Sequence, residues 1–172
     1  MWVRLAVKGP KRTRKGGVFS IRIAASHDAE EILQCLDQAF APYRSSYTPG
    51  AFADTVLSRE MLRKRFIEMT VLVAVDFSGC VIGTIAYKVQ ENGEGHLRGM
   101  AVRPEWHGSE VAKKLLEQSE SDLRDLHCKA ITLDTTKPLQ RAIRFYEKNG
   151  FRATGEVASF FRMELFAYRK EI

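Results

Sequence analysis

The stretch Leu97-Arg-Gly-Met-Ala-Val-Arg-Pro-Glu-Trp-His-Gly-Ser-Glu-Val-Ala-Lys-Lys-Leu-Leu116 decides the fold of this chain. Its first part predicts a strand that ends at Pro104, and its last part predicts an amphipathic helix. Gly108 lies in the turn between them, where a residue without a side chain lets the backbone approach a ligand closely. The start of such a helix presents free amide groups and the positive end of the helix dipole. The stretch therefore predicts a turn that binds a phosphate.

Gly99 interrupts the strand in this stretch. Glycine inside a strand is typical of a β-bulge or of a close backbone approach. We therefore expect strand amides or carbonyls near residue 99 to be left free to bind a ligand.

A second stretch is Ile131-Thr-Leu-Asp-Thr-Thr-Lys-Pro-Leu-Gln-Arg-Ala-Ile-Arg-Phe-Tyr-Glu-Lys-Asn-Gly-Phe151. It predicts a strand, a loop and a helix that Gly150 closes. Together the two stretches resemble the GNAT superfamily of acetyl-CoA-dependent N-acetyltransferases. The first is similar to its Val-x-Pro-x-x-(Gln/Arg)-x-x-Gly-x-(Gly/Ala) pyrophosphate motif, and the second to its Ala-x-x-x-Tyr-Glu-x-x-Gly-Phe ending.

The rest of the chain agrees with an α/β fold of the α+β kind, in which helices flank a central mixed, largely antiparallel sheet. The expected order is βααβββαβαββ, which also follows the family. Asp28 and Glu31 predict a capping box at the first helix, and a loop is expected at 41–50. Strands are expected at 18–23, 70–75, 81–89, 96–102, 130–133, 151–157 and 160–166, and helices at 28–40, 59–69, 108–126 and 141–149.

The 172 residues suit one compact domain, which we place at 18–172. The net charge of +6 comes from residues 1–20, which hold six basic and no acidic residues. The remainder carries 21 basic and 21 acidic residues, so a basic face on the domain is not implied. We expect residues 1–17 to be a mobile basic extension, and we do not expect nucleic acid to be the partner of the chain.

The chain has no apolar run long enough to span a bilayer and no recognisable secretory signal, so no membrane partner is expected. Its cysteines, Cys35, Cys80 and Cys128, lack the spacing of metal ligands, and no metal is expected. We interpret them as reduced thiols that behave as small buried hydrophobic residues. These features predict a cytoplasmic protein.

The resemblance implies roles for individual residues. Backbone groups of the 100–102 segment would bind the pantetheine arm of acetyl-CoA, and a strand amide near Met100 would stabilise the developing oxyanion. Amides of the 107–112 turn would hold the pyrophosphate. Tyr146 matches the tyrosine that protonates the departing thiolate, although a core aromatic is the competing interpretation. The cofactor-binding set is Met100, Ala101, Val102, His107, Gly108, Ser109, Glu110, Val111 and Ala112.

Three positions depart from the family pattern. His107 stands where the family has Gln or Arg, and Leu139 stands where it often has Asn. Glu110 replaces a motif glycine. Its carboxylate suits the start of a helix but would repel a pyrophosphate, so weakened coenzyme A binding is expected.

The general base and the acceptor stay open at this point. Glu94, His96, Asp134 or a water chain are the candidates for the base. Tyr43, Arg44 and Tyr47 lie in the region that binds the acceptor in the family, and Arg44 is a candidate partner for a substrate carboxylate. A polar surface loop is the alternative interpretation of these three residues.

We therefore expect an acyltransferase that moves an acetyl group from acetyl-CoA to a primary amine by direct attack in a ternary complex. A small molecule is the expected acceptor, with a protein amine as the nearest variant. The alternative is a non-catalytic acyl-CoA-binding or interaction module on the same fold. Family members often pair through their C-terminal strands, so the resemblance also allows a homodimer.

Overall fold

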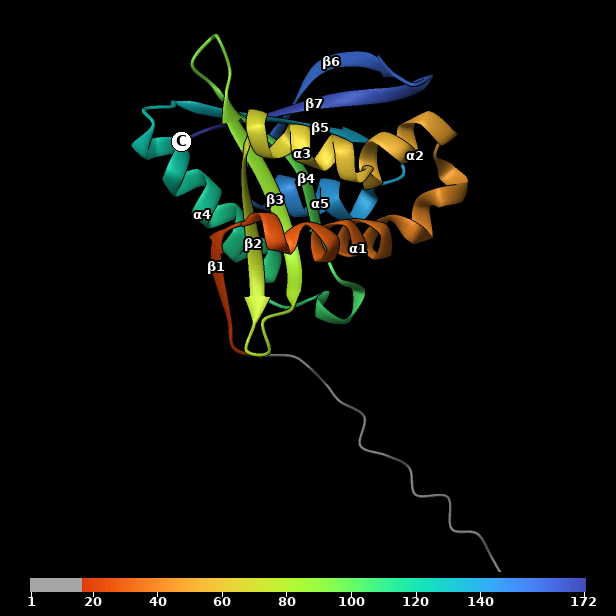
Figure 1. Cartoon of the computed structure of the whole chain (residues 1–172). Helices are drawn as coiled ribbons and strands as arrows, with labels where there is room; N and C mark the ends of the chain where they lie inside the picture. The colour runs from red at the N-terminus through yellow and green to blue at the C-terminus, as the bar shows by residue number, and fades with distance from the viewer. Residues whose placement is uncertain (1–16) are drawn as a thin grey trace, which may run out of the picture.

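A seven-stranded sheet with helices on both faces makes up the part of the chain that the computed structural model describes, residues 17–172 (Figure 1). The strands are β1 (Phe19–Ile23), β2 (Thr70–Asp76), β3 (Val81–Val89), β4 (Gly95–Val102), β5 (Ala130–Thr136), β6 (Arg152–Phe160) and β7 (Met163–Glu171). The helices are α1 (Ala29–Phe40), α2 (Pro49–Val56), α3 (Arg59–Glu68), α4 (Val111–Asp125) and α5 (Gln140–Lys148), and short 3-10 turns cover Ser26–Asp28, Ala41–Ser46 and Pro104–Trp106.

The strand order is β1-β2-β3-β4-β5-β7-β6, and only the β4–β5 pair among these neighbours is parallel. The predicted mixed, largely antiparallel sheet is therefore confirmed. β1 and β6 form its two edges, and the side chains of β6 are almost all exposed. A homodimer through the C-terminal strands stays a prediction.

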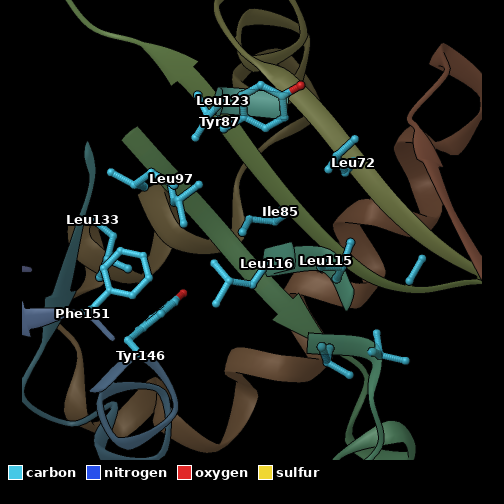
Figure 2. Close-up of a cluster of buried hydrophobic side chains, with 14 of the residues drawn as sticks. Leu72, Ile85, Tyr87, Leu97, Leu115, Leu116, Leu123, Leu133, Tyr146 and Phe151 are labelled. Atoms are coloured by element: carbon cyan, nitrogen blue, oxygen red, sulfur yellow. The ribbon is translucent and has the colours of Figure 1, made fainter. Parts of the chain in front are cut away.

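Two apolar layers cover the sheet. α1 and α3 pack on one face against Val71, Val73 and Val75 of β2. On the other face, α4 and α5 pack on a cluster that includes Leu72 of the same strand (Figure 2). Because β2 is covered on both faces, its sequence is a run of apolar residues and does not alternate between apolar and polar residues.

The predicted capping box at α1 is wrong. The carboxylate of Asp28 accepts hydrogen bonds from the Arg22 guanidinium, at 2.7 and 2.8 Å, and from the Ala25 amide. Glu31 accepts from the amide of Val81 at 2.6 Å. Both side chains join α1 to neighbouring segments, and the Asp28 side chain does not cap the helix.

The loop expected at 41–50 is also wrong in part, because it holds a 3-10 turn and the start of α2. Pro49 occupies the first turn of α2, where its missing N–H costs nothing, and the Thr48 hydroxyl accepts from the Ala51 amide at 3.3 Å. The domain boundary at residue 18 is not tested, since residues 1–16 lie outside the described part.

Two smaller expectations meet the structure directly. Cys35 and Cys128 are buried, whereas Cys80 is exposed, so the expectation of a buried thiol is wrong for Cys80. Among residues 17–172, no helix has the length and apolar character that crossing a membrane requires.

Candidate active site

A cleft opens where β4 and β5 part. Residues Gly95–Leu97 of β4 pair with Ile131–Leu133 of β5. Beyond this short ladder the two strands no longer pair, although β4 continues to Val102 and β5 to Thr136. Their carboxyl ends therefore diverge, and a crevice at the carboxyl ends of parallel strands is a common ligand site. The cleft has a volume of about 830 Å³ and is lined by residues of β4, β5, α2, α3, α5 and the turn before α4.

A β-bulge shapes the β4 wall of the cleft. Thr84 of β3 pairs with Ala101 and Ala86 pairs with Arg98, so Ile85 faces both Gly99 and Met100. Gly99 has a φ of +65°, which favours glycine. The bulge predicted from this glycine is present, and it interrupts the ladder beside the cleft.

The three residues expected to bind pantetheine differ in which side their backbone faces. Ala101 lies opposite Thr84 and Val102 opposite Gly83 in the β3–β4 ladder. Because the next amide along β4, that of Arg103, donates to β3, the backbone groups of Val102 point to the other side, toward β5. The Val102 carbonyl accepts a hydrogen bond from Nε2 of His107 at 2.9 Å. His107 therefore occupies one of the acceptors expected for the pantetheine arm. Burial and the nearby Arg141 cation lower the pKa of His107, which favours the neutral ring.

The turn before α4 presents free amides, as predicted. Within residues 17–172, the amides of Gly108, Glu110 and Ala112 have no hydrogen-bond acceptor, whereas His107 and Ser109 donate to Pro104 and Trp106. Gly108 has a φ of +78° and faces open space. The expected turn therefore offers alternate rather than consecutive amides, since the 3-10 turn already uses the others.

The charge around this turn is mixed. Lys113 and Arg141 line the cleft and bring two cations to it. The Glu110 side chain is 68% exposed, and its carboxylate lies 4.0 Å from Nζ of Lys113. Its φ of −76° needs no glycine, so the local backbone accepts glutamate without strain.

The cleft also contains a buried polar atom without a partner. Oγ1 of Thr135, on β5, has no hydrogen-bond partner among the described residues. Thr135 lines the cleft, where β5 has left β4. Buried hydroxyl groups are almost always hydrogen-bonded, so this one marks a place for a polar ligand. An extended arm that carries amides, such as pantetheine, fits such a slot between two strands.

Tyr146 lies between the cleft and the core. Its ring contacts Phe145 and Phe151, with centroids 5.5 and 5.6 Å away. Figure 2 shows its hydroxyl pointing away from α5, in the direction of Leu116. Tyr146 also lines the cleft. Burial raises the pKa of its phenol, so the hydroxyl keeps its proton at neutral pH.

His96 and Asp134 meet at the cleft, whereas Glu94 does not line it. Nε2 of His96 lies 3.9 Å from Oδ2 of Asp134, and both residues line the cleft. Glu94 binds Arg169 at 2.9 Å. The structure thus brings His96 and Asp134 together at the cleft, whereas Glu94, the third candidate base, forms an ion pair elsewhere.

The hydrogen bonds of Thr132 assign the tautomer of His96. The Thr132 hydroxyl donates to the Gly95 carbonyl at 3.2 Å, so its oxygen accepts from Nδ1 of His96 at 2.9 Å. Nδ1 therefore carries the proton, and Nε2 holds a free lone pair near Asp134. Burial lowers the pKa of His96, more than Asp134 raises it, and the ring is neutral at pH 7.

The acceptor residues expected at 43–47 divide into two groups. Tyr43 and Tyr47 line the cleft, and the Tyr47 hydroxyl lies 2.6 Å from Oγ1 of Thr136. Arg44 is 67% exposed, does not line the cleft, and lies 3.5 Å from Asp37 with its guanidinium over the Phe52 ring. The structure thus places Tyr43 and Tyr47 at the cleft and Arg44 outside it.

Sequence reasoning missed three charged residues that line this end of the cleft: Asp54, Arg65 and Arg98. Arg65 is the signal that the sequence did offer. It falls three residues after Leu62 and one before Phe66, on the apolar face of α3, where a lone cation is unusual.

A family model, a curated protein and solved structures match this chain. Residues 32–151 match the family model described as the acetyltransferase (GNAT) family. A curated relative, an IAA acetyltransferase of Azospirillum brasilense, is 33% identical over 79 residues, which span 45% of this chain and 52% of that protein. The match therefore covers about half of the relative's length.

Solved structures share the fold across most of the chain. The PaiA N-acetyltransferase of Thermoplasma acidophilum, in complex with coenzyme A, has a TM-score of 0.75 at 19% identity and covers 90% of this chain and 99% of its own. The ribosomal-protein-S18-alanine N-acetyltransferase of Escherichia coli has a TM-score of 0.73 at 15% identity, covering 90% and 94%.

Proposed function

The chain belongs to the GNAT family of acetyltransferases, and we propose that it transfers the acetyl group of acetyl-CoA to a primary amine of a small molecule. The observation that carries this proposal is the cleft between β4 and β5, which ends at the free amides before α4. The lining includes the turn before α4, whose free amides would bind an anion, and also Tyr47 and charged residues of α2 and α3.

Binding of the co-substrate would use backbone groups more than side chains. The amides of Gly108, Glu110 and Ala112 are free to bind the pyrophosphate, with Lys113 and Arg141 nearby. Backbone groups of Met100, the amide of Val102 and Oγ1 of Thr135 would bind the pantetheine arm, since these residues line the cleft. When bound, acetyl-CoA supplies an activated acetyl thioester.

Two side chains would move protons while the amine attacks the acetyl carbon directly. The new C–N bond forms as the C–S bond breaks. Nε2 of His96 would accept a proton from the amine, directly or through water, and Asp134 would stabilise the resulting imidazolium. Tyr146 would donate its phenolic proton to the departing sulfur. The bulge at Gly99 and Met100 leaves a strand amide to stabilise the oxyanion.

The test is a thiol-release assay with acetyl-CoA and a panel of primary amines, in which mass spectrometry identifies each product. We expect an acetylated small amine and an equal amount of free coenzyme A. A peptide with a free N-terminus and a lysine serves as the protein-acceptor arm. The proposal would be contradicted if, for every amine, the rate of thiol release only equalled that of the slow hydrolysis of acetyl-CoA.

Glu110 favours a second function, a non-catalytic module that binds acyl-CoA weakly or not at all. Replacement of Glu110 by Gly is expected to strengthen acetyl-CoA binding by about two- to fivefold, because a carboxylate beside the pyrophosphate is removed. Glu110→Gln removes the charge without introducing a glycine, and it should give most of the gain in affinity for acetyl-CoA. Calorimetric titration at low salt measures both variants, and affinities equal to that of the parent chain would show that Glu110 does not hinder binding.

A further inference from the structure

Arg65 of α3 is the most deeply buried cation of the cleft wall. Its side chain is 8% exposed, and it shares the sheet-facing side of α3 with Leu62. A charged group in such a place loses most of its hydration, so it needs a partner of opposite charge.

The guanidinium of Arg65 lies against the bulge of β4. A Cβ atom at Gly99 would fall 2.4 Å from Nη1 of Arg65, so glycine is what allows the guanidinium to lie there. Arg65 and Gly99 both line the cleft. The cation therefore faces the same bulge at which acetyl transfer is proposed.

Arg65 has no bonded partner in the described part of the chain, residues 17–172. The acid whose charge acts on Arg65 is Asp54 of α2, but its Oδ2 is bound to Arg98 at 2.5 Å. The cluster of Asp54, Arg65 and Arg98 thus holds two cations and one carboxylate. Burial and the Arg98 cation lower the pKa of Arg65 to about 10, and the guanidinium remains charged at neutral pH.

A planar guanidinium that faces a cleft without a partner is suited to bind a carboxylate through two parallel hydrogen bonds. We propose that the acceptor amine carries a carboxylate group and that Arg65 binds this carboxylate while the amine lies at the bulge of β4. The inference rests on the proposed acetyl transfer and narrows its acceptor to amino acids and related amino carboxylates. Arg65 is then a specificity-determining residue.

This assignment differs from the one that the sequence suggests. Arg44 is the cation of the predicted acceptor loop, but it lies outside the cleft beside Asp37 and Phe52. The two arginines therefore make a matched pair. One is buried, faces the cleft and has no bonded partner among residues 17–172, and the other is exposed and already paired.

The experiment compares each of a set of α-, β- and γ-amino acids with its own amide in the thiol-release assay. We expect kcat/KM for at least one acid to exceed that for its amide by about 10- to 100-fold, as a charge-assisted hydrogen bond would give. In Arg65→Met the ratio of kcat/KM for the acid to kcat/KM for its amide should fall to about one, mainly because KM for the acid rises. Arg65→Lys should restore part of it, and Arg44→Met should leave it unchanged.

Loss of folding is not expected to confuse this result. Replacing a buried, unpaired cation by methionine removes a desolvation penalty, so the melting temperature of Arg65→Met should equal or exceed that of the parent chain. The proposal would be overturned if the parent chain acetylated the neutral amides as efficiently as the acids. It would also be overturned if the preference for acids survived in Arg65→Met.

A second readout does not depend on turnover. The Nε–H signal of Arg65, assigned with Arg65→Lys, is followed by NMR while sodium propionate or propionamide is added to the protein with coenzyme A. We expect a saturable shift with propionate and none with propionamide. No shift with propionate would overturn the carboxylate site, whereas a shift without turnover of any amine would retain the site and reject acetyl transfer.

Discussion

Replacement of Tyr146 by Phe is expected to lower kcat for amine acetylation by about 100- to 1,000-fold, because the chain loses its proton donor to the departing sulfur. The ring contacts with Phe145 and Phe151 would remain, so stability and acetyl-CoA affinity should hardly change. The raised pKa of the phenol keeps the proton on the oxygen until it is needed. Steady-state thiol release measures kcat, and calorimetry measures the affinity.

Tyr168→Phe is the matched control for this variant. Tyr168 of β7 belongs to the same apolar cluster and is equally buried, but it does not line the cleft. Its loss of a hydroxyl should leave kcat within about twofold, since it removes no group that faces the reaction. A similar kcat for Tyr146→Phe and Tyr168→Phe would mean that Tyr146 is a core aromatic and no acid.

The second large effect is expected at His96. Neutral His96 accepts the proton, so kcat/KM should rise with pH through an apparent pKa below 6.5 and be lost as the pH falls below it. His96→Asn retains a donor toward Thr132 but has no base, and it should lower kcat/KM at pH 7 by about 100-fold. The fall in kcat/KM below pH 6.5 should be absent in this variant.

Asp134→Asn tests the partner of this histidine. The charge of Asp134 raises the pKa of His96, against burial and the cations Lys88 and Arg98, which lower it. Without that carboxylate, the acidic limb of the pH profile should move to lower pH. A profile that keeps its acidic limb in His96→Asn would assign the proton transfer to a water chain instead.

The parts of the site that lie close together in sequence could be predicted from it. The turn at Gly108, the bulge at Gly99 and the position of Tyr146 on α5 follow from local patterns, and the structure contains all three. The family motifs depend on these same residues. The fold class and most of the strands were therefore accessible without a structure.

The role of Arg65 depends on contacts between distant segments, so no local pattern could reveal it. Its burial results from the packing of α3 onto the β4 bulge, and within the described part of the chain it has no bonded partner because Asp54 pairs with Arg98. The choice among Glu94, His96 and Asp134 has the same origin. Each is a polar residue next to a strand until the structure shows which of them face the cleft.

The turn between β6 and β7 was misplaced for a related reason. Strands were expected to end at 157 and begin at 160, but β6 runs to Phe160 and the turn is formed by Phe161 and Arg162. Both have positive φ angles, 48° and 66°, which usually call for Gly or Asn. The Phe161 ring packs on Gly50 of α2 and its carbonyl accepts from Thr48, so tertiary contacts stabilise an unusual turn.

The cleft between β4 and β5 is the proposed binding site of acetyl-CoA. Calorimetric titration of the purified protein with acetyl-CoA tests it most directly, with coenzyme A and pantetheine in parallel. Binding of one acetyl-CoA per chain in the micromolar range is predicted, with coenzyme A similar and pantetheine far weaker, because pantetheine cannot reach the amides before α4. No binding at millimolar acetyl-CoA would rule out acetyl transfer in this cleft and leave a non-catalytic module on an acetyltransferase scaffold.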